Sequence, residues 1–450
     1  MAPKKKNTTA TVTIPKSNKR TRQSKPKPKP KPKPEPGFTT TTDDIEDFQF
    51  RGDDEVGGIR ASLLKWYDAN KRDLPWRRIN HDDDGDDETE RDRKAYGVWV
   101  SEIMLQQTRV QTVISYFNRW MEKWPTVHHL AQASIEEVNE MWAGLGYYRR
   151  ARFLLEGAKM IVEEGGQFPR SVNDLRKVKG IGEYTAGAIA SIAFNEAVPV
   201  VDGNVVRVIA RLKTISANPK DTATVKNIWR LAGQLVDLDR PGDFNQALME
   251  LGATLCTPLS PSCSSCPVSA QCGALSESKR NPSMLVTDYP TKVAKVRQRH
   301  DFSAISVVEI LEGEEGGSEF LLVKRPEEGL LAGLWEFPSV SLDGEADVVT
   351  RRQAIDDFLK SSFGLSSCNV VEREEVGEYV HIFTHIRLKM YIELLVLRSR
   401  DVHRKKAKGV TSYKYVDTKT LASMGLSTGV RKAYNMVQKF KQTRSNLIPK

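Results

Sequence analysis

The stretch VKGIGEYTAGAIA, Val178 to Ala190, places Gly180 and Gly182 on either side of one isoleucine and continues with small residues at helical spacing. Glycine permits backbone turns that other residues resist, and it leaves room for another group to approach. A helix that begins directly after such a turn presents unpaired N–H groups, which form an anion site. A tight turn between two helices would explain the same glycines without any ligand. The stretch therefore predicts a helix, a turn and a second helix, with Tyr184 as the first large residue after the turn.

A second stretch, VVDGNVVRV from Val200 to Val208, carries an acid directly before another helical pattern. Asp202 is well suited to cap that helix, and capping is the commoner role of aspartate in such a place. An acid at a helix N-terminus near a phosphate-binding turn is also well placed to stabilise a developing cation. These residues alone leave both roles open.

The segment before the glycine turn has a helical pattern of apolar residues. They lie at Tyr96, Val100, Ile103, Val110, Ile114, Phe117, Met121 and Trp124. Thr108 and Gln111 form a T-x-x-Q capping box, which predicts a new helix there and leaves Gln107 at a joint between helices. Glu102 lies just over one turn before this joint. With similar patterns on either side, region 55–275 is predicted to be nearly all helix with short joints marked by glycine.

Two further local signals lie in this helical region. Ser134 and Glu137 form a second capping box, which begins another helix. HDDDGDDETERD, His81 to Asp92, is an acidic insertion between helical patterns. We expect a solvated loop there, which phosphate would repel.

The pattern changes in the last third of the chain. FSAISVVEIL, EFLLVKR, MYIELLVL and TSYKYV are β-branched or alternating runs, with one helical pattern among them. We therefore expect a separate α+β domain over 301–440. A linker over 276–300, rich in Ser, Pro and charge, precedes it, and a C-terminal tail over 441–450 follows.

The net charge is concentrated at the N-terminus. The chain has 450 residues, too many for one core, and a formal net charge of +10. Residues 1–37 hold 12 Lys/Arg and one Glu, which is +11, so the rest of the chain is about −1 (10 − 11). PKKK, SNKRTR and KPKPKPKPKP predict an extended, disordered basic tail over 1–54. Such a tail suits nuclear import and attraction to nucleic acid, while a solubilising arm and a mitochondrial form stay open.

Four of the five cysteines form a cluster: Cys256, Cys263, Cys266 and Cys272, spaced C-x6-C-x2-C-x5-C. No apolar run is long enough to cross a membrane and no secretory signal opens the chain, so we expect an intracellular protein without disulfides or a membrane partner. Four thiolates at this spacing can hold a tetrahedral metal or an iron–sulfur cluster. The spacing favours the cluster over zinc only modestly. Cys368 is remote and is predicted to be an ordinary buried thiol.

At this point the motifs resemble a known family. KGIGEYTAG followed by VVDGNV resembles the helix-hairpin-helix DNA glycosylases, and the four cysteines narrow this to the branch with a [4Fe–4S] cluster. VSEIMLQQT at 100–108 and LLAGLWEFPSV at 330–340 then resemble the MutY-type adenine DNA glycosylases. The resemblance covers about residues 58–440.

The resemblance implies a multidomain fold. An all-α helix-hairpin-helix glycosylase domain would combine a six-helix barrel over about 89–195 with an iron–sulfur subdomain over about 55–88 and 196–275. The C-terminal domain would be an α+β Nudix-like fold. The implied cofactor is a [4Fe–4S] cluster on the four clustered cysteines.

The resemblance also implies an activity. Such enzymes remove adenine mispaired with 8-oxoguanine, or with guanine, from double-stranded DNA after flipping the base out. Glu102 matches the general acid, and Asp202 matches the carboxylate that stabilises an oxocarbenium-like sugar. Asn204 matches a neighbour that orients the nucleophile. Endonuclease III-type relatives carry a nucleophilic lysine where this chain has Tyr184, so we expect little lyase activity and a tyrosine packed near Asp202.

Other matched positions concern binding. Those lining the adenine pocket are Arg77, Gln246 and Glu250; those that wedge into the base stack are Gln107, Thr108, Leu145 and Tyr147; those that read 8-oxoguanine are Phe383, Thr384 and His385; and those that approach a DNA phosphate are Gly180 and Gly182. Thr384 replaces the family's usual serine and keeps a hydroxyl group. We expect a monomer that binds DNA with A:8-oxoguanine or A:G mispairs.

Several positions depart from the family pattern. RRQAIDDFLKSSFGL has Gln353 where a Nudix hydrolase needs Glu, followed only by Asp356 and Asp357, so we expect no nucleotide hydrolysis. The loop TPLSPS between the first two clustered cysteines lacks the Arg or Lys of relatives, which weakens one phosphate contact. We expect no zinc in the linker and find no sliding-clamp peptide in QTRSNLIPK.

Two alternatives differ in testable features. An oxidised-pyrimidine glycosylase/lyase of the same fold would be expected to carry lysine at position 184 and to lack the second domain. A non-catalytic damage reader would be expected to lose Glu102 or Asp202, and this chain keeps both.

Overall fold

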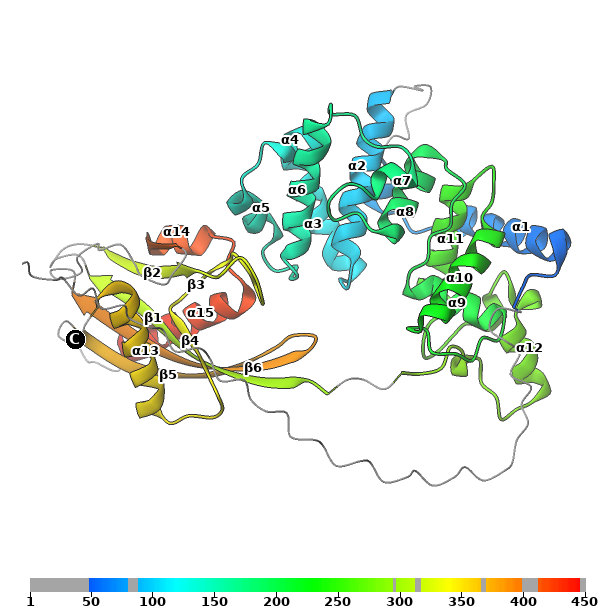
Figure 1. The fold of residues 1–450 in the computed structure, drawn as a ribbon. Helices are drawn as coiled ribbons and strands as arrows, with labels where there is room; N and C mark the ends of the chain where they lie inside the picture. The colour runs from blue at the N-terminus through cyan, green and yellow to red at the C-terminus, as the bar shows by residue number, and fades with distance from the viewer. Residues whose placement is uncertain are drawn as a thin grey trace, which may run out of the picture. The chain divides into compact units, whose positions relative to one another are not determined.

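The computed structural model describes residues 48–79, 88–293, 297–311, 317–365, 370–398 and 412–445. Three expectations lie wholly or mainly outside these residues: the basic tail, the acidic insertion and Cys368. Within the described ranges, the chain divides into a helical part followed by an α+β part, which confirms the predicted fold class (Figure 1).

The helical part contains these elements: α1 (Gly52–Asn70), η2 (Pro75–Arg77), α2 (Glu88–Leu105), α3 (Val110–Lys123), α4 (Val127–Ala131), α5 (Ile135–Trp142), α6 (Arg149–Glu163), α7 (Val172–Leu175), α8 (Glu183–Phe194), α9 (Gly203–Leu212), α10 (Thr222–Leu235), α11 (Pro241–Thr254), η3 (Cys263–Ser265), η4 (Ser269–Gln271), α12 (Gly273–Arg280) and η5 (Val286–Asp288). They enclose two apolar cores. One lies among α2 to α8 and is filled by Trp99, Trp120 and Trp142. The other lies among α1, α9, α10 and α11. Among the described residues, none of the helices is both long and apolar enough to cross a membrane.

The glycine turn joins α7 to α8 as expected, but its two glycines differ in backbone conformation and surroundings. Gly180 has a φ of +87°, and a Cβ there would lie 2.6 Å from the Cβ of Phe153. Gly182 has an ordinary φ of −91°, and a Cβ there would meet nothing within 4 Å. Gly180 is therefore required by the turn and its packing, whereas only Gly182 leaves open space in front of the α8 N-terminus.

The α+β part is built on a sheet. Its strands are β1 (Arg299–Leu311), β2 (Ser318–Lys324), β3 (Trp335–Glu336), β4 (Ser339–Leu342), β5 (Val370–Ile382), β6 (Ile386–Arg398) and β7 (Tyr413–Asp417), and its helices are α13 (Val348–Phe363), α14 (Thr418–Ser423) and α15 (Thr428–Ser445). The strand order is β3-β2-β1-β6-β5, with β4 paired to β1 and β7 paired to β2. β1 and β6 are parallel, and β5 and β6 form an antiparallel hairpin. α13 covers one face of the sheet and α14 with α15 covers the other, so both faces are buried (Figure 1).

Element boundaries differ from the predicted domain limits at three places. α1 begins at Gly52, inside the predicted tail, because Asp53, Asp54 and Glu55 favour a helix N-terminus. α12 continues to Arg280, into the predicted linker over 276–300, and η5 lies within that linker. α15 continues to Ser445, beyond the predicted limit at 440.

Ion pairs explain the longer last helix. Lys441 pairs with the buried Glu309, and Arg444 pairs with Glu372 of β5. These contacts fasten the final turns of α15 to the sheet, which a pattern of apolar residues does not reveal.

One predicted capping box is confirmed and the other is wrong. Ser134 and Glu137 make both reciprocal hydrogen bonds at the start of α5. α3 instead begins at Val110 after Arg109, and the Thr108 hydroxyl donates to the Gln106 carbonyl. Thr108 therefore belongs to the joint, one residue too early to cap the helix.

Candidate active site

The acid at the end of α2 is held by the tyrosine that follows the glycine turn. Glu102 is buried, with 7% of its surface exposed. The Tyr184 hydroxyl donates a hydrogen bond of 2.5 Å to Glu102 Oε2. The pKa of Glu102 is raised to about 7, chiefly by burial and also by the nearby Asp202 carboxylate, while the Tyr184 hydrogen bond and Arg77 limit the rise. At neutral pH a substantial fraction of Glu102 therefore carries a proton.

Asp202 caps α9 and lies close enough to shift the pKa values of both Glu102 and Tyr184. Its Oδ1 accepts the backbone N–H groups of Asn204 and Val205 at 2.8 and 2.7 Å. Its Oδ2 accepts the Asn204 side-chain amide at 2.7 Å. Burial raises the pKa of Asp202, and these hydrogen bonds limit the rise. The capping role and a place beside Glu102 are therefore both present, so the two alternatives are compatible.

Arg207 orients the Asn204 amide, and sequence reasoning missed it. Its Nη2 donates to Asn204 Oδ1 at 2.8 Å and to the Gly252 carbonyl at 2.7 Å, and its Nε donates to the Cys256 carbonyl at 2.8 Å. With Asn204 Oδ1 occupied, the amide nitrogen must face Asp202. The i, i+3 spacing of Asn204 and Arg207 on one helix was the available signal.

The predicted adenine-pocket residues form one hydrogen-bonded group. Arg77 Nε donates to Gln246 Oε1, and Arg77 Nη2 donates to Glu250 Oε2, both at 3.0 Å. Glu250 is 1% exposed and also accepts from Arg72 at 2.6 and 2.9 Å. Both Glu250 oxygens are thus engaged by arginine, so this carboxylate holds Arg77 in place. Arg72 was not anticipated.

One cavity of about 970 Å³ gathers these groups, which is the upper range for ligand pockets in proteins. The predicted residues that line it are Glu102, Tyr184, Asp202, Asn204, Arg77, Gln246, Glu250, Gln107 and Thr108. Elements far apart in the sequence therefore bring the catalytic, adenine-pocket and part of the wedge positions together.

Two predicted wedge residues are exposed at turns, and one is not. Gln107 has a φ of +55° and Tyr147 a φ of +51°, and 48% of the Tyr147 surface is exposed. Leu145 is instead buried in the first core, with 7% exposed. The expectation that Leu145 wedges into DNA does not fit this placement, because the turn at Gly146 points its side chain inward while Tyr147 points outward.

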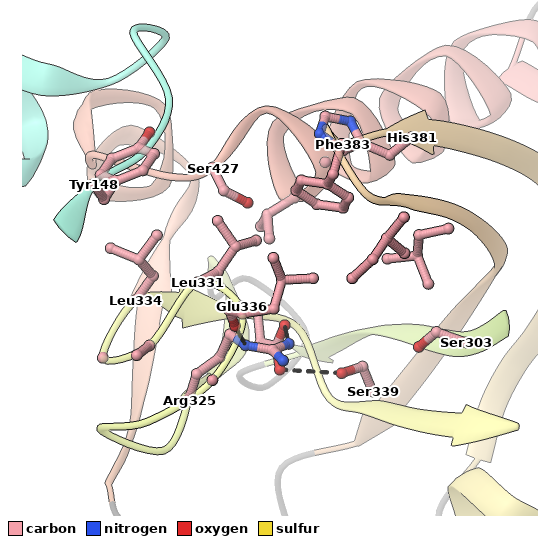
Figure 2. A pocket seen from close by; sticks show the side chains of 18 of the residues that line it. Tyr148, Ser303, Arg325, Leu331, Leu334, Glu336, Ser339, His381, Phe383 and Ser427 are labelled. Carbon is pink, nitrogen blue, oxygen red and sulfur yellow. Dashed lines mark hydrogen bonds and ion pairs between the residues drawn. The ribbon is translucent and has the colours of Figure 1, made fainter. Parts of the chain in front are cut away.

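The predicted 8-oxoguanine triplet forms the turn between β5 and β6. The Phe383 N–H donates to the Ile386 carbonyl at 2.8 Å, and Thr384 and His385 are exposed. The His381 and Phe383 rings lie 4.3 Å apart on the lining of a cavity (Figure 2). The side chains of Thr384 and His385 therefore lie at the surface of the hairpin tip.

The same cavity wall carries an acid that sequence reasoning missed. Glu336 accepts hydrogen bonds from Arg325 at 2.5 Å and from Ser339 at 3.1 Å (Figure 2). Burial raises the pKa of Glu336. Both Glu336 oxygens are engaged, so this acid organises the wall.

Acidic residues on and beside α13 are also engaged by other side chains. Arg373 donates to Asp356 at 2.8 Å and to Glu393 at 3.0 Å. Gln353, where a hydrolase would carry Glu, donates to Asp357 at 3.0 Å. Each of these three carboxylates is therefore engaged by a neighbouring side chain.

The four clustered cysteines fit a shared anionic cofactor. Burial and the other three thiols raise the pKa of Cys266 to about 11, so Cys256, Cys263 and Cys272 lie within electrostatic reach of it. Arg211 is 1% exposed and donates to Cys256 Sγ at 3.2 Å. A buried cation beside four thiols suits a negatively charged thiolate cluster. Within the described residues, no group of three or more His, Cys, Asp or Glu is arranged to hold a single metal ion.

The fold and the cavity define a class. Residues 100–234 match the family model described as HhH-GPD superfamily base excision DNA repair protein, and residues 310–436 match the NUDIX domain model. The protein is therefore a helix-hairpin-helix base excision repair glycosylase with a C-terminal Nudix-like domain.

Similar curated proteins narrow the class to one family. The chain is 59% identical over 419 residues to an adenine DNA glycosylase of Arabidopsis thaliana, spanning 86% of this chain but 65% of that protein. It is 42% identical over 422 residues to the adenine DNA glycosylase of Mus musculus, spanning 86% of this chain and 79% of that protein. The chain belongs to the adenine DNA glycosylase family. A solved thermostable thymine-DNA glycosylase is 26% identical, with a TM-score of 0.42 over 49% of this chain and 97% of the other.

Proposed function

We propose that this protein hydrolyses the N-glycosidic bond of adenine opposite 8-oxoguanine or guanine in duplex DNA, without cutting the strand. The observation that carries the proposal is the pairing in one cavity of Glu102, whose pKa is about 7, with Asp202. Two carboxylates in unlike environments provide the acid and the anionic stabiliser that glycoside hydrolysis needs.

Each side chain has a defined task in this reaction. Adenine flipped out of the duplex would enter the cavity beside Arg77 and Gln246. Tyr184 donates to Glu102 Oε2, so the proton of the neutral acid rests on Oε1 and can pass to the departing base. The Asp202 carboxylate then stabilises the positive charge that develops on the sugar as the bond to adenine breaks. Water adds to the anomeric carbon, and its proton passes to the Glu102 carboxylate, which restores the acid.

Tyr184 also argues against lyase activity. A phenol cannot form a Schiff base, and burial holds the pKa of Tyr184 well above its usual value, so it remains a hydrogen-bond donor. Strand cleavage through a Schiff base, as in an oxidised-pyrimidine glycosylase/lyase, would need an amine at this position.

The decisive experiment uses duplexes with adenine opposite 8-oxoguanine or guanine, with and without a later alkali step. We expect strand breakage only after alkali, because base removal leaves an alkali-labile abasic site. Breakage without alkali would contradict the monofunctional assignment and would direct attention to Lys71 and Lys94, which line the cavity. Binding without base release would favour the damage reader.

We propose that Thr384, at the tip of the β5–β6 hairpin, hydrogen-bonds 8-oxoguanine. Thr384→Val keeps the shape but removes the hydroxyl, so the ratio of excision rates opposite 8-oxoguanine and guanine should fall about fivefold, the value of roughly one hydrogen bond. Thr443→Val, at an exposed site on α15, is the matched control. An unchanged ratio for Thr384→Val would remove Thr384 from recognition.

We propose a [4Fe–4S] cluster on Cys256, Cys263, Cys266 and Cys272. When bound, it would hold the segment from Cys256 to Cys272, which follows α11, together through four thiolate bonds and would supply structural stability. About four iron and four sulfide per chain would support this assignment, and zinc without sulfide would contradict it.

We propose that the protein acts as a monomer in the nucleus, directed there by the basic runs in residues 1–37. A fluorescent protein fused to those residues should accumulate in nuclei. Accumulation in mitochondria or an even distribution through the cell would contradict the proposed nuclear localisation.

A further inference from the structure

Arg150, near the start of α6, is a partly buried cation held by neutral groups. Its donors reach the carbonyl oxygens of Ile103 (2.8 Å), Met104 (3.2 Å), Gln106 (2.6 Å), Gly146 (3.1 Å) and Leu145 (3.5 Å) and the Thr108 hydroxyl (3.4 Å). In the part of the chain that the structure describes, no carboxylate pairs with it. Burial lowers the pKa of Arg150 to about 10, so it remains charged at pH 7.

The first group of contacts caps the end of α2. Ile103 and Met104 belong to its last turn and directly follow Glu102. Carbonyls at a helix C-terminus lack partners within the helix and carry partial negative charge, which a guanidinium satisfies. Arg150 therefore stabilises the turn that places the general acid.

The second group of contacts holds the peptides that lead into two strained residues. Gln106 and Gly146 directly precede Gln107 and Tyr147, which both have left-handed backbone conformations. Such conformations are unfavourable for non-glycine residues and persist only where neighbouring contacts enforce them. The Arg150 guanidinium also lies 5.4 Å from the centre of the Tyr147 ring.

We infer that Arg150 is a positioning residue that holds the backbone at Gln107 and Tyr147 in register with the helix end that carries Glu102. Insertion of the two wedge side chains into DNA and placement of the acid are then set by one guanidinium. The inference rests on the proposed function, because it assumes that Gln107 and Tyr147 enter the base stack.

Lysine should not replace Arg150. An ammonium keeps the charge but lacks the planar fork of donors. That fork reaches the end of α2, the joint at Gln106 and the turn at Gly146 at once. We expect Arg150→Lys to lower the single-turnover rate of adenine release by about 10- to 100-fold, the usual cost of misplaced reacting groups.

Arg60 provides a matched control for helix capping alone. From α1 it donates to the carbonyls of Gln234, Leu235 and Val236 at the end of α10, at 3.2, 3.0 and 2.5 Å. Arg60→Lys should lower stability to urea by about as much as Arg150→Lys does. Its single-turnover rate should stay within about twofold of the wild-type rate. Equal rate losses in Arg60→Lys and Arg150→Lys would overturn the inference.

A double-mutant cycle separates positioning from general damage to the fold. The Arg150→Lys rate loss should become several-fold smaller when Gln107→Ala and Tyr147→Ala are already present, because only the effect on the turn that places Glu102 then remains. The same loss in both backgrounds would overturn the inference.

Fluorescence of 2-aminopurine beside the 8-oxoguanine reports insertion without base release. The wild type should unstack the probe, and Arg150→Lys should reduce the signal several-fold. A wild type that unstacks the probe but releases no adenine would contradict the proposed function and leave this inference standing. An undiminished signal in Arg150→Lys would refute the inference itself.

Discussion

Replacing Glu102 by glutamine should lower the single-turnover rate of adenine release at pH 7 by about 10³-fold, within the range that a general acid contributes. Glutamine fills the same space and can still accept the Tyr184 hydrogen bond, but it has no proton to give to the leaving base. Affinity for duplexes that contain the mispair should change little. A rate within about fivefold of wild type would exclude Glu102 as the acid.

The pH profile tests the same role without disturbing the site. Because the reaction uses the protonated form of a group with a pKa of about 7, the wild-type rate should fall as the pH rises above 7. The Tyr184 hydrogen bond lowers the pKa of Glu102, so Tyr184→Phe should move this decline to higher pH. Glu102→Gln should lose the decline altogether. A decline that persists in Glu102→Gln would belong to another group.

The raised pKa also has a consequence for stability. In the folded state the pKa of Glu102 is about 7, above the ordinary value of 4.5, so the folded state binds more protons between these pH values. The contribution of Glu102 to stability is therefore full below about pH 4.5 and is lost as the pH rises through about 7. At pH 8 the buried carboxylate costs about 3 kcal/mol at most, so Glu102→Gln should resist urea better than wild type at pH 8 but not at pH 5. If Glu102→Gln and wild type differed in urea stability by the same amount at pH 5 and pH 8, burial would not be the cause of the raised Glu102 pKa.

Local signals in the sequence were sufficient where a few neighbouring residues determine the geometry. The Ser134–Glu137 box and the Asp202 cap each involve groups three or fewer residues apart, and both form as expected. The failure at Thr108 has the same origin. A capping box specifies spacing but not which residue caps the helix, and here the N-cap is Arg109, one position after Thr108.

Contacts between distant segments could not be predicted from spacing. Arg150 and Arg207 bind mainly backbone carbonyls, and any residue type can supply a carbonyl, so no pattern marks their partners. Tyr184 and Glu102 are 82 residues apart, and only the resemblance to a family placed both in one site. Leu145 shows the limit of that reasoning, since a motif match does not say which side of a turn faces the core.

Asp202 is both a helix cap and a proposed catalytic carboxylate, and a charge exchange with Asn204 can separate the two roles. Asp202→Asn keeps an oxygen that can accept the N–H groups of Asn204 and Val205. Its new amide nitrogen would face the Asn204 amide nitrogen, which Arg207 holds in that direction. Two facing donors should lower the free energy of unfolding by about 1–2 kcal/mol.

Combining Asp202→Asn with Asn204→Asp should restore these hydrogen bonds with the carboxylate moved by two residues. The introduced amide can then donate to the introduced carboxylate, whose other oxygen accepts from Arg207. Stability should return to within about 0.5 kcal/mol of wild type. Adenine release should remain about 10³-fold slower in both the single and the double variant, because the negative charge no longer lies where the sugar becomes cationic. Urea unfolding and single-turnover assays measure the two outcomes separately. Recovery of activity together with stability in the double variant would mean that Asp202 acts only as a cap.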